Sequence, residues 1–158
     1  MKAVLLAAGR GKRLCDYTKS IPKSLLKVAN KPILFHIIDR ILANGIKEFV
    51  VVVGFKKDMI IDALKKKYPK INFVFVENDI FDKTNTLYSL FITKDQIKED
   101  FLYFNADVMF NKNILIEKTL KIIQAANILK IPIIYTEQYP KGLGETASEL
   151  KKELSQVI

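Results

Sequence analysis

The stretch that decides the fold is AVLLAAGRGKRL, Ala3 to Leu14. Its apolar first half is typical of a short strand that is buried on both faces, as in a parallel sheet. The second half ends this strand abruptly with two glycines, Gly9 and Gly11, which allow a sharp turn and a close approach to a ligand. Because ligands of parallel α/β sheets bind at the carboxyl ends of strands, this loop lies where function is expected.

Short strand patterns and longer amphipathic helix patterns alternate along the rest of the chain. Strands are expected at residues 2–7, 48–53, 72–77, 101–105 and 131–135, and helices at residues 31–44, 56–68, 85–97, 113–129 and 146–157. Such alternation indicates parallel strands joined by right-handed crossovers. We therefore predict one α/β domain over residues 1–158, a three-layer sandwich with a mainly parallel, Rossmann-like sheet of about five strands.

The composition excludes several classes of protein. Hydrophobic residues make up 49% of the chain, so disorder is not expected. No apolar run reaches the roughly 20 residues of a membrane span, and no signal peptide is visible. We therefore expect a cytoplasmic protein that has no membrane partner.

The formal net charge of +9 suits an anionic partner such as a nucleotide, a sugar phosphate or a nucleic acid. A lysine-rich composition, as an AT-rich genome produces, is the alternative explanation for this charge. The cations also cluster locally, at Arg10, Lys12, Arg13, Lys19, Lys23 and Lys27. No nucleic-acid partner is expected, because aromatic residues are not interleaved with these cations as stacking platforms.

The glycine loop has the properties of a phosphate site. Successive backbone N–H groups of such a turn can point at an anion, and an arginine fork matches phosphate oxygens. Two familiar phosphate loops do not fit: a Walker loop needs Gly-Lys-Ser/Thr, which is absent, and a dinucleotide fingerprint needs a third glycine where Leu14 stands. The loop thus predicts phosphate binding, with an ordinary surface turn as the alternative.

Three segments in order, LAAGRGKRL, IPKSLLKVANKPIL and FNADV, resemble the nucleotidyltransferases that make sugar nucleotides and similar activated head groups. The resemblance covers residue 1 to about residue 117, and NTLYSL (Asn85–Leu90) is similar to the branch that includes phosphocholine cytidylyltransferases. It implies Mg²⁺, a nucleoside triphosphate (CTP or another) and a phosphorylated small-molecule acceptor. Pyrophosphate is then the leaving product.

The same resemblance implies roles for individual residues. The nucleotide-binding residues are Ala7, Ala8, Gly9, Gly11, Arg13 and Lys23. Arg13 and Lys23 are the catalytic residues, and a cation at Lys23 would stabilise charge on the attacked phosphorus. Asp107 would hold Mg²⁺ against triphosphate oxygens. For Lys23 the alternative is one of many surface lysines, and for Asp107 a turn residue or helix cap.

The last part of the chain resembles a different family. Leu120–Lys151, with the core TEQYPKGLG, is similar to a segment of the isochorismatase-like cysteine hydrolases that lacks their catalytic residues. We therefore expect a chimera within one domain, a nucleotidyltransferase-like portion at 1–118 and a helix–strand–helix segment at 119–158. No second metal aspartate follows Asp107, so the alternative function is an inactive nucleotide-binding scaffold. An open sheet edge would also allow a homodimer.

Overall fold

The computed structural model describes residues 1–11 and 18–108. The chain divides into two units, Met1–Lys121 and Ile122–Ile158, and all the described residues belong to the first unit. The strand expected at 131–135, the helices expected at 113–129 and 146–157, and the expected junction at residue 118 lie outside the described residues. In the described part, no helix combines the length and the apolar character needed to cross a bilayer.

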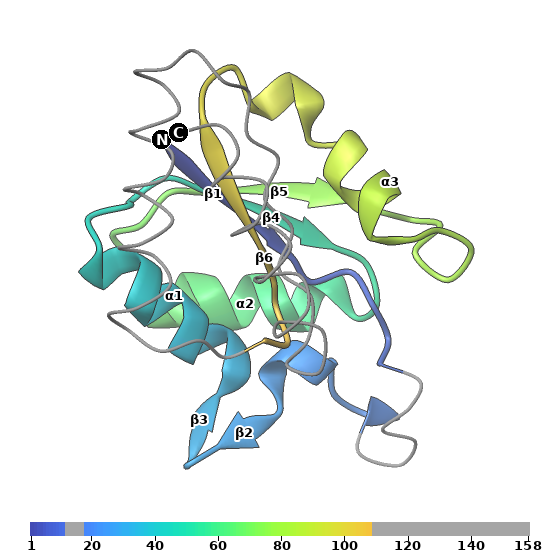
Figure 1. The fold of residues 1–158 in the computed structure, drawn as a ribbon. Coiled ribbons are helices and arrows are strands. Elements are labelled where there is room, and N and C mark those ends of the chain that lie inside the picture. The colour runs from blue at the N-terminus through green and yellow to red at the C-terminus, as the bar shows by residue number, and fades with distance from the viewer. Residues whose placement is uncertain (12–17, 109–158) are drawn as a thin grey trace, which may run out of the picture. The chain divides into compact units, whose positions relative to one another are not determined.

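Four parallel strands form the main sheet of the described residues, in the order β5-β4-β1-β6 (Figure 1). Their bounds are Lys2–Leu6 (β1), Phe49–Val53 (β4), Phe73–Glu77 (β5) and Phe101–Asn105 (β6). β1 lies between β4 and β6, so that Leu6 is opposite Val52 on one side and Asn105 on the other. The α/β class and these four expected strands are confirmed.

The middle of the sheet is the core of the described unit. Ala3, Val4 and Leu5 of β1 have 0% exposure, and all five residues of β4 are buried. Continuous apolar strands of this kind form because both faces of a parallel sheet are covered. The carboxyl ends of β1 and β4 are therefore held in fixed positions by the core.

Helices lie on both faces of the sheet. Their bounds are Ile33–Ala43 (α1), Lys57–Lys67 (α2) and Thr86–Phe91 (α3). Along the sequence, β4 and then β5 are added on one side of β1, and β6 is added on the other side. Right-handed crossovers then place α1 and α2 on one face and α3 on the other, as Figure 1 shows. The predicted three-layer arrangement is confirmed.

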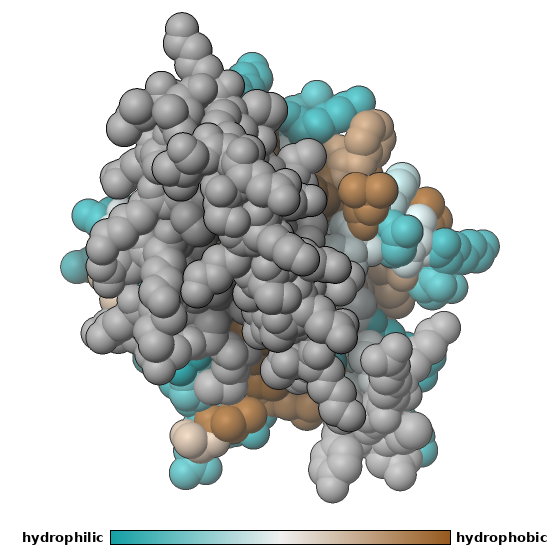
Figure 2. Space-filling view, viewed as in Figure 1, coloured by the Kyte–Doolittle hydropathy of each residue, from teal (hydrophilic) through white to brown (hydrophobic). Residues whose placement is uncertain are grey.

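The short helix α3 differs from the helices on the other face. The apolar stripes of α1 and α2 are buried, with Ile37 and Leu64 at 0% exposure. On α3, Leu87 and Phe91 are 72% and 58% exposed, and brown surface lies over this helix in Figure 2. The buried residue of α3 is the polar Ser89.

A small hairpin was not expected from the sequence. β2 (Lys27–Val28) and β3 (Lys31–Pro32) pair antiparallel, and the turn residues Ala29 and Asn30 have φ of 49° and 63°. Two consecutive positive φ values are the geometry of a tight type I′ hairpin turn. The expected helix at 31–44 therefore begins only at Ile33.

The expected helix at 85–97 is also shorter than predicted. Asn85 is the N-cap of α3, because its side-chain oxygen accepts a hydrogen bond from the Tyr88 N–H at 3.1 Å. The helix ends at Phe91, and a separate 3₁₀ turn, η3 (Lys94–Gln96), follows. A single helix at 85–97 was thus the wrong prediction, whereas its start was correct within one residue.

Candidate functional site

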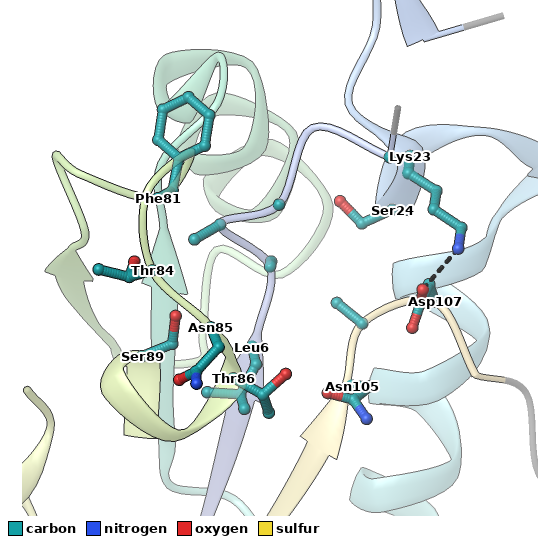
Figure 3. A pocket seen from close by; sticks show the side chains of 15 residues that line it. Leu6, Lys23, Ser24, Phe81, Thr84, Asn85, Thr86, Ser89, Asn105 and Asp107 are labelled. Carbon is teal, nitrogen blue, oxygen red and sulfur yellow. Dashed lines mark hydrogen bonds and ion pairs between the residues drawn. The ribbon is translucent and has the colours of Figure 1, made fainter. Parts of the chain in front are cut away.

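A pocket of about 330 Å³ lies at the carboxyl edge of the sheet (Figure 3). Its walls are the loop after β1, the 3₁₀ turn η2 (Lys23–Leu25), the segment from Phe81 to Ser89, and the end of β6. In Figure 3, Lys23 and Asp107 lie on one side of this pocket and Thr84, Asn85 and Ser89 on the other. Segments that are far apart in the sequence, from Leu6 to Asp107, therefore line one pocket.

The site residues that the sequence predicts are brought together here. Those that line the pocket are Ala7, Ala8, Gly9, Gly11, Lys23 and Asp107. Arg13 lies outside the described residues. Because these residues line one pocket, they are close enough to contact one ligand. The ligand itself and the role of each residue stay predictions.

Gly11 is needed for the close contact between the glycine loop and Lys23. Its φ is +72°, a conformation that residues with a side chain rarely adopt. A Cβ at Gly11 would also lie 3.0 Å from the Cβ of Lys23 and 3.1 Å from its Cδ. The Thr18 hydroxyl donates to the Gly11 carbonyl at 3.2 Å, so the end of this loop is anchored to buried Thr18.

A second close approach occurs where β4 ends. A Cβ at Gly54 would lie 2.9 Å from the carbonyl oxygens of both Ala8 and Asn78. The next residue, Phe55, donates its backbone N–H to the Ala8 carbonyl at 2.9 Å. Gly54 therefore lets the end of β4 hold the turn at Ala8 in place. Sequence reasoning missed this residue, although a glycine directly after a buried strand was a signal for it.

An ion pair closes one wall of the pocket. The Lys23 ammonium donates to the Asp107 carboxylate at 2.6 Å, and the two side chains are 33% and 35% exposed. Asp107 is placed by the end of β6, where the Ala106 N–H still donates to the Leu6 carbonyl at 3.1 Å. The pair joins residues 84 positions apart in the chain. It therefore presents one cation and one carboxylate to the same space.

Buried polar contacts fix the opposite wall. Asn78 follows β5, is 1% exposed, and donates from Nδ2 to the hydroxyls of Thr84 and Ser89, both at 3.0 Å. The Asn78 N–H donates to the Val53 carbonyl at 2.8 Å, which ties this wall to β4. A wall held by satisfied buried hydrogen bonds is rigid. Of the segment NTLYSL, which was noted from its resemblance alone, Asn85, Thr86 and Ser89 line the pocket.

The residues around Asp107 can be tested for their fit to Mg²⁺. Among the described residues, no group of three or more His, Cys, Asp and Glu side chains could hold a metal ion. Asp107 is the carboxylate in the described lining of the pocket. Mg²⁺ is commonly bound through one or two carboxylates together with substrate phosphates and water. The donor set therefore fits a metal that binds with a phosphate ligand.

The chain is similar to known proteins in both sequence and fold. The sequence model of the family described as nucleotidyl transferase matches residues 2–144. This match runs into the segment at 120–151 that resembles isochorismatase-like hydrolases. The comparisons therefore support the nucleotidyltransferase portion and give no support to a hydrolase-like segment or a chimera.

Three relatives illustrate the similarity. The chain is 40% identical over 114 residues to the bifunctional protein GlmU of Methanococcus maripaludis, covering 72% of this chain and 26% of GlmU. It is 36% identical over 114 residues to the UTP–glucose-1-phosphate uridylyltransferase AglF of Haloferax volcanii, covering 72% and 46%. The solved CTP:phosphocholine cytidylyltransferase LicC of Streptococcus pneumoniae is 35% identical with a TM-score of 0.63, covering 72% and 48%. The chain thus spans less than half the length of each relative.

Proposed function

This chain belongs to the nucleotidyl transferase family, and we propose that it transfers a nucleotidyl group from a nucleoside triphosphate to a phosphorylated small molecule. Pyrophosphate is the other product. The observation that carries this proposal is the convergence of the glycine loop, Lys23 and Asp107 on one pocket. A basic, glycine-lined pocket at the carboxyl edge of a parallel sheet suits a triphosphate.

In the proposed reaction, a phosphate oxygen of the acceptor attacks the α-phosphorus in line. The bond from this phosphorus to the bridging oxygen breaks, and pyrophosphate leaves with the electron pair. No protein nucleophile is required, so positioning and charge neutralisation supply the catalysis.

Each site residue has a part in this proposal. The turn from Ala7 to Gly11 holds the nucleotide, and its glycines leave room for close contact; nothing lies within 4 Å of a Cβ built at Gly9. Lys23 and Arg13 stabilise the negative charge that develops at the α-phosphate. Asp107 would hold Mg²⁺, which when bound would neutralise charge on the triphosphate.

The Lys23–Asp107 ion pair requires an exchange of partners when the nucleotide binds. Both side chains are about one third exposed, so breaking their pair costs little free energy, about 1 kcal/mol or less. Lys23 would then contact phosphate oxygens, and the Asp107 carboxylate would be free to hold the metal ion. Because both charges regain an opposite charge, the exchange leaves neither group unpaired.

The relatives suggest which substrates to test first. They include a uridylyltransferase named for UTP and glucose 1-phosphate, and a cytidylyltransferase named for CTP and phosphocholine. We therefore propose CTP or UTP as the nucleotide, and a sugar 1-phosphate or phosphocholine as the acceptor.

The proposal can be tested in two stages. In the first, the melting temperature of the full chain is measured with MgCl₂ and each of CTP, UTP, ATP and GTP, and at least one nucleotide should raise it. In the second, pyrophosphate release is measured with that nucleotide and either glucose 1-phosphate or phosphocholine. No stabilisation by any nucleotide would contradict the proposal. Binding without pyrophosphate release from any acceptor would favour the inactive nucleotide-binding domain instead.

A further inference from the structure

Ser24 is a pocket residue that neither the glycine motif nor the resemblance assigns. It follows Lys23 in η2 and lines the same pocket. The residue is only 4% exposed. In Figure 3 its hydroxyl is directed from η2 toward the loop that follows β1, next to Lys23.

The hydroxyl of Ser24 is unusual because it is buried and unpaired. Within the described part of the chain, its oxygen has no hydrogen-bond partner. Buried polar atoms almost always have one, and an unpaired one destabilises the protein. The hydroxyls of Thr84 and Ser89 in the same pocket are both bonded to Asn78. Ser24 thus has the geometry of a group whose partner arrives with a ligand.

The local backbone holds this hydroxyl in place. In η2 the Leu25 N–H donates to the Pro22 carbonyl at 2.9 Å, and the Leu26 N–H donates to the Lys23 carbonyl at 3.1 Å. Buried Leu25 anchors the turn in the core. The ammonium of Lys23 and the hydroxyl of Ser24 are therefore presented by consecutive residues of one fixed turn, which reduces the entropy lost on binding.

The surroundings indicate the chemistry of the missing partner. A hydroxyl beside an ammonium group and a glycine turn is suited to an anionic oxygen, because that acceptor also interacts with the cation. We propose that Ser24 Oγ donates a hydrogen bond to a phosphate oxygen of the bound nucleotide, at the phosphate that Lys23 contacts. This inference rests on the proposed function and adds Ser24 to the nucleotide-binding residues.

The test is the variant Ser24→Ala, which removes the hydroxyl and little else. Its affinity for the nucleotide that binds wild type, measured by calorimetry with MgCl₂, should be about tenfold weaker. The free energy of unfolding without ligand should be unchanged or higher, since an unpaired buried group has been removed. The corresponding nucleoside, measured as a competitor, should bind both proteins equally because it has no phosphate. Ser20→Ala is the matched control, since Ser20 is an exposed serine that precedes η2 and is not part of the pocket lining.

Each other result has a definite meaning. Equal nucleotide affinity of Ser24→Ala and wild type would overturn the role of Ser24 and leave the proposed function standing. Equal losses of nucleotide and nucleoside affinity, or a lower free energy of unfolding, would assign Ser24 a structural role and also overturn the inference. If wild type binds none of the four nucleotides, the proposed function fails, and the inference fails with it.

Discussion

Two lysine–aspartate pairs of similar exposure lie in different regions of the molecule. Lys23 and Asp107 are 33% and 35% exposed, and Lys31 and Asp39 are 34% and 40% exposed. The difference is in what else the carboxylate binds. Asp39 also accepts a hydrogen bond from the Tyr68 hydroxyl at 2.7 Å, whereas Lys23 is the partner of Asp107 within the described residues.

The second cluster, Lys31–Asp39–Tyr68, is completed by the protein itself. It joins β3, α1 and the C-cap of α2, and the Tyr68 hydroxyl also lies 3.3 Å from the Phe35 carbonyl. Burial raises the pKa of Asp39, but the hydrogen bonds from Lys31 and Tyr68 outweigh it, so the pKa lies below its ordinary value. Exposure alone therefore does not identify a site. In the described part of the chain, the carboxylate in the pocket lacks the second protein partner that Asp39 has, so it can accept a ligand.

The largest expected effect is on the rate of the transfer reaction, which should depend on Lys23 and not on Lys31. Lys23→Ala should lower the rate of pyrophosphate release about 10²–10³-fold, because one charge donor to the reacting phosphate is lost. Lys31→Ala is the matched control and should leave this rate unchanged. The measurement is the rate with the nucleotide and acceptor that wild type uses. Similar losses in both variants would break the distinction between the pairs.

For stability the order is reversed, and the aspartate outside the pocket, Asp39, should matter more than Asp107. Asp39→Ala should lower the free energy of unfolding by about 1–2 kcal/mol, since Tyr68 and Lys31 both lose their acceptor. Asp107→Ala should change it by less than about 0.5 kcal/mol, because a single, partly exposed ion pair with no further hydrogen bond to a described residue contributes little. Urea unfolding of both variants measures this. A larger loss for Asp107→Ala would make the pocket pair a structural element.

A smaller effect concerns metal binding without nucleotide. Lys23→Ala releases Asp107 from its ion pair and removes a nearby positive charge, so Mn²⁺ alone should bind up to about fivefold more tightly. The same variant should bind the metal–nucleotide complex more weakly. Electron paramagnetic resonance of free Mn²⁺ measures the first affinity. Unchanged or weaker Mn²⁺ binding would contradict the exchange of partners that we propose.

The smallest effect is the pH dependence of the structural cluster. A carboxyl group with a lowered pKa in the folded state stabilises the protein above its unfolded pKa, near 3.8, and loses this contribution as the pH falls through the folded value. The difference in melting temperature between wild type and Asp39→Asn should therefore be largest near about pH 6 and shrink toward about pH 3. A difference that grows as the pH falls would mean the assigned direction is wrong.

Much of the fold could be predicted because its elements have strong local patterns. The valines of β4 and the helical spacing of Ile37, Ile38 and Ile41 in α1 place these elements within two residues of their observed bounds. The β2–β3 hairpin could not be predicted, since its strands have two residues each and Ala29 gives no sign of a positive φ. Such a turn is imposed by the tertiary structure.

The sequence predicted residues that line the site, but it could not predict the contacts between them. The glycine turn, Lys23 and Asp107 follow from motifs, but the 2.6 Å contact between two residues 84 positions apart depends on the sheet order. Gly54 and Asn78 support the pocket from the ends of β4 and β5. The position of Gly54 directly after a buried strand was a usable signal, whereas no motif marks Asn78. The unpaired hydroxyl of Ser24 is likewise visible only when its surroundings are known.

The central claim is that the glycine turn, Lys23 and Asp107 bind one metal–nucleotide complex. Calorimetric titration of wild type and Asp107→Asn with CTP, UTP, ATP and GTP in MgCl₂ tests it most directly. We expect one saturable site in wild type for at least one nucleotide, and an affinity at least about 30-fold weaker in the variant, which keeps the shape of the side chain but not its charge. Equal affinity of the two proteins for that nucleotide would contradict the claim.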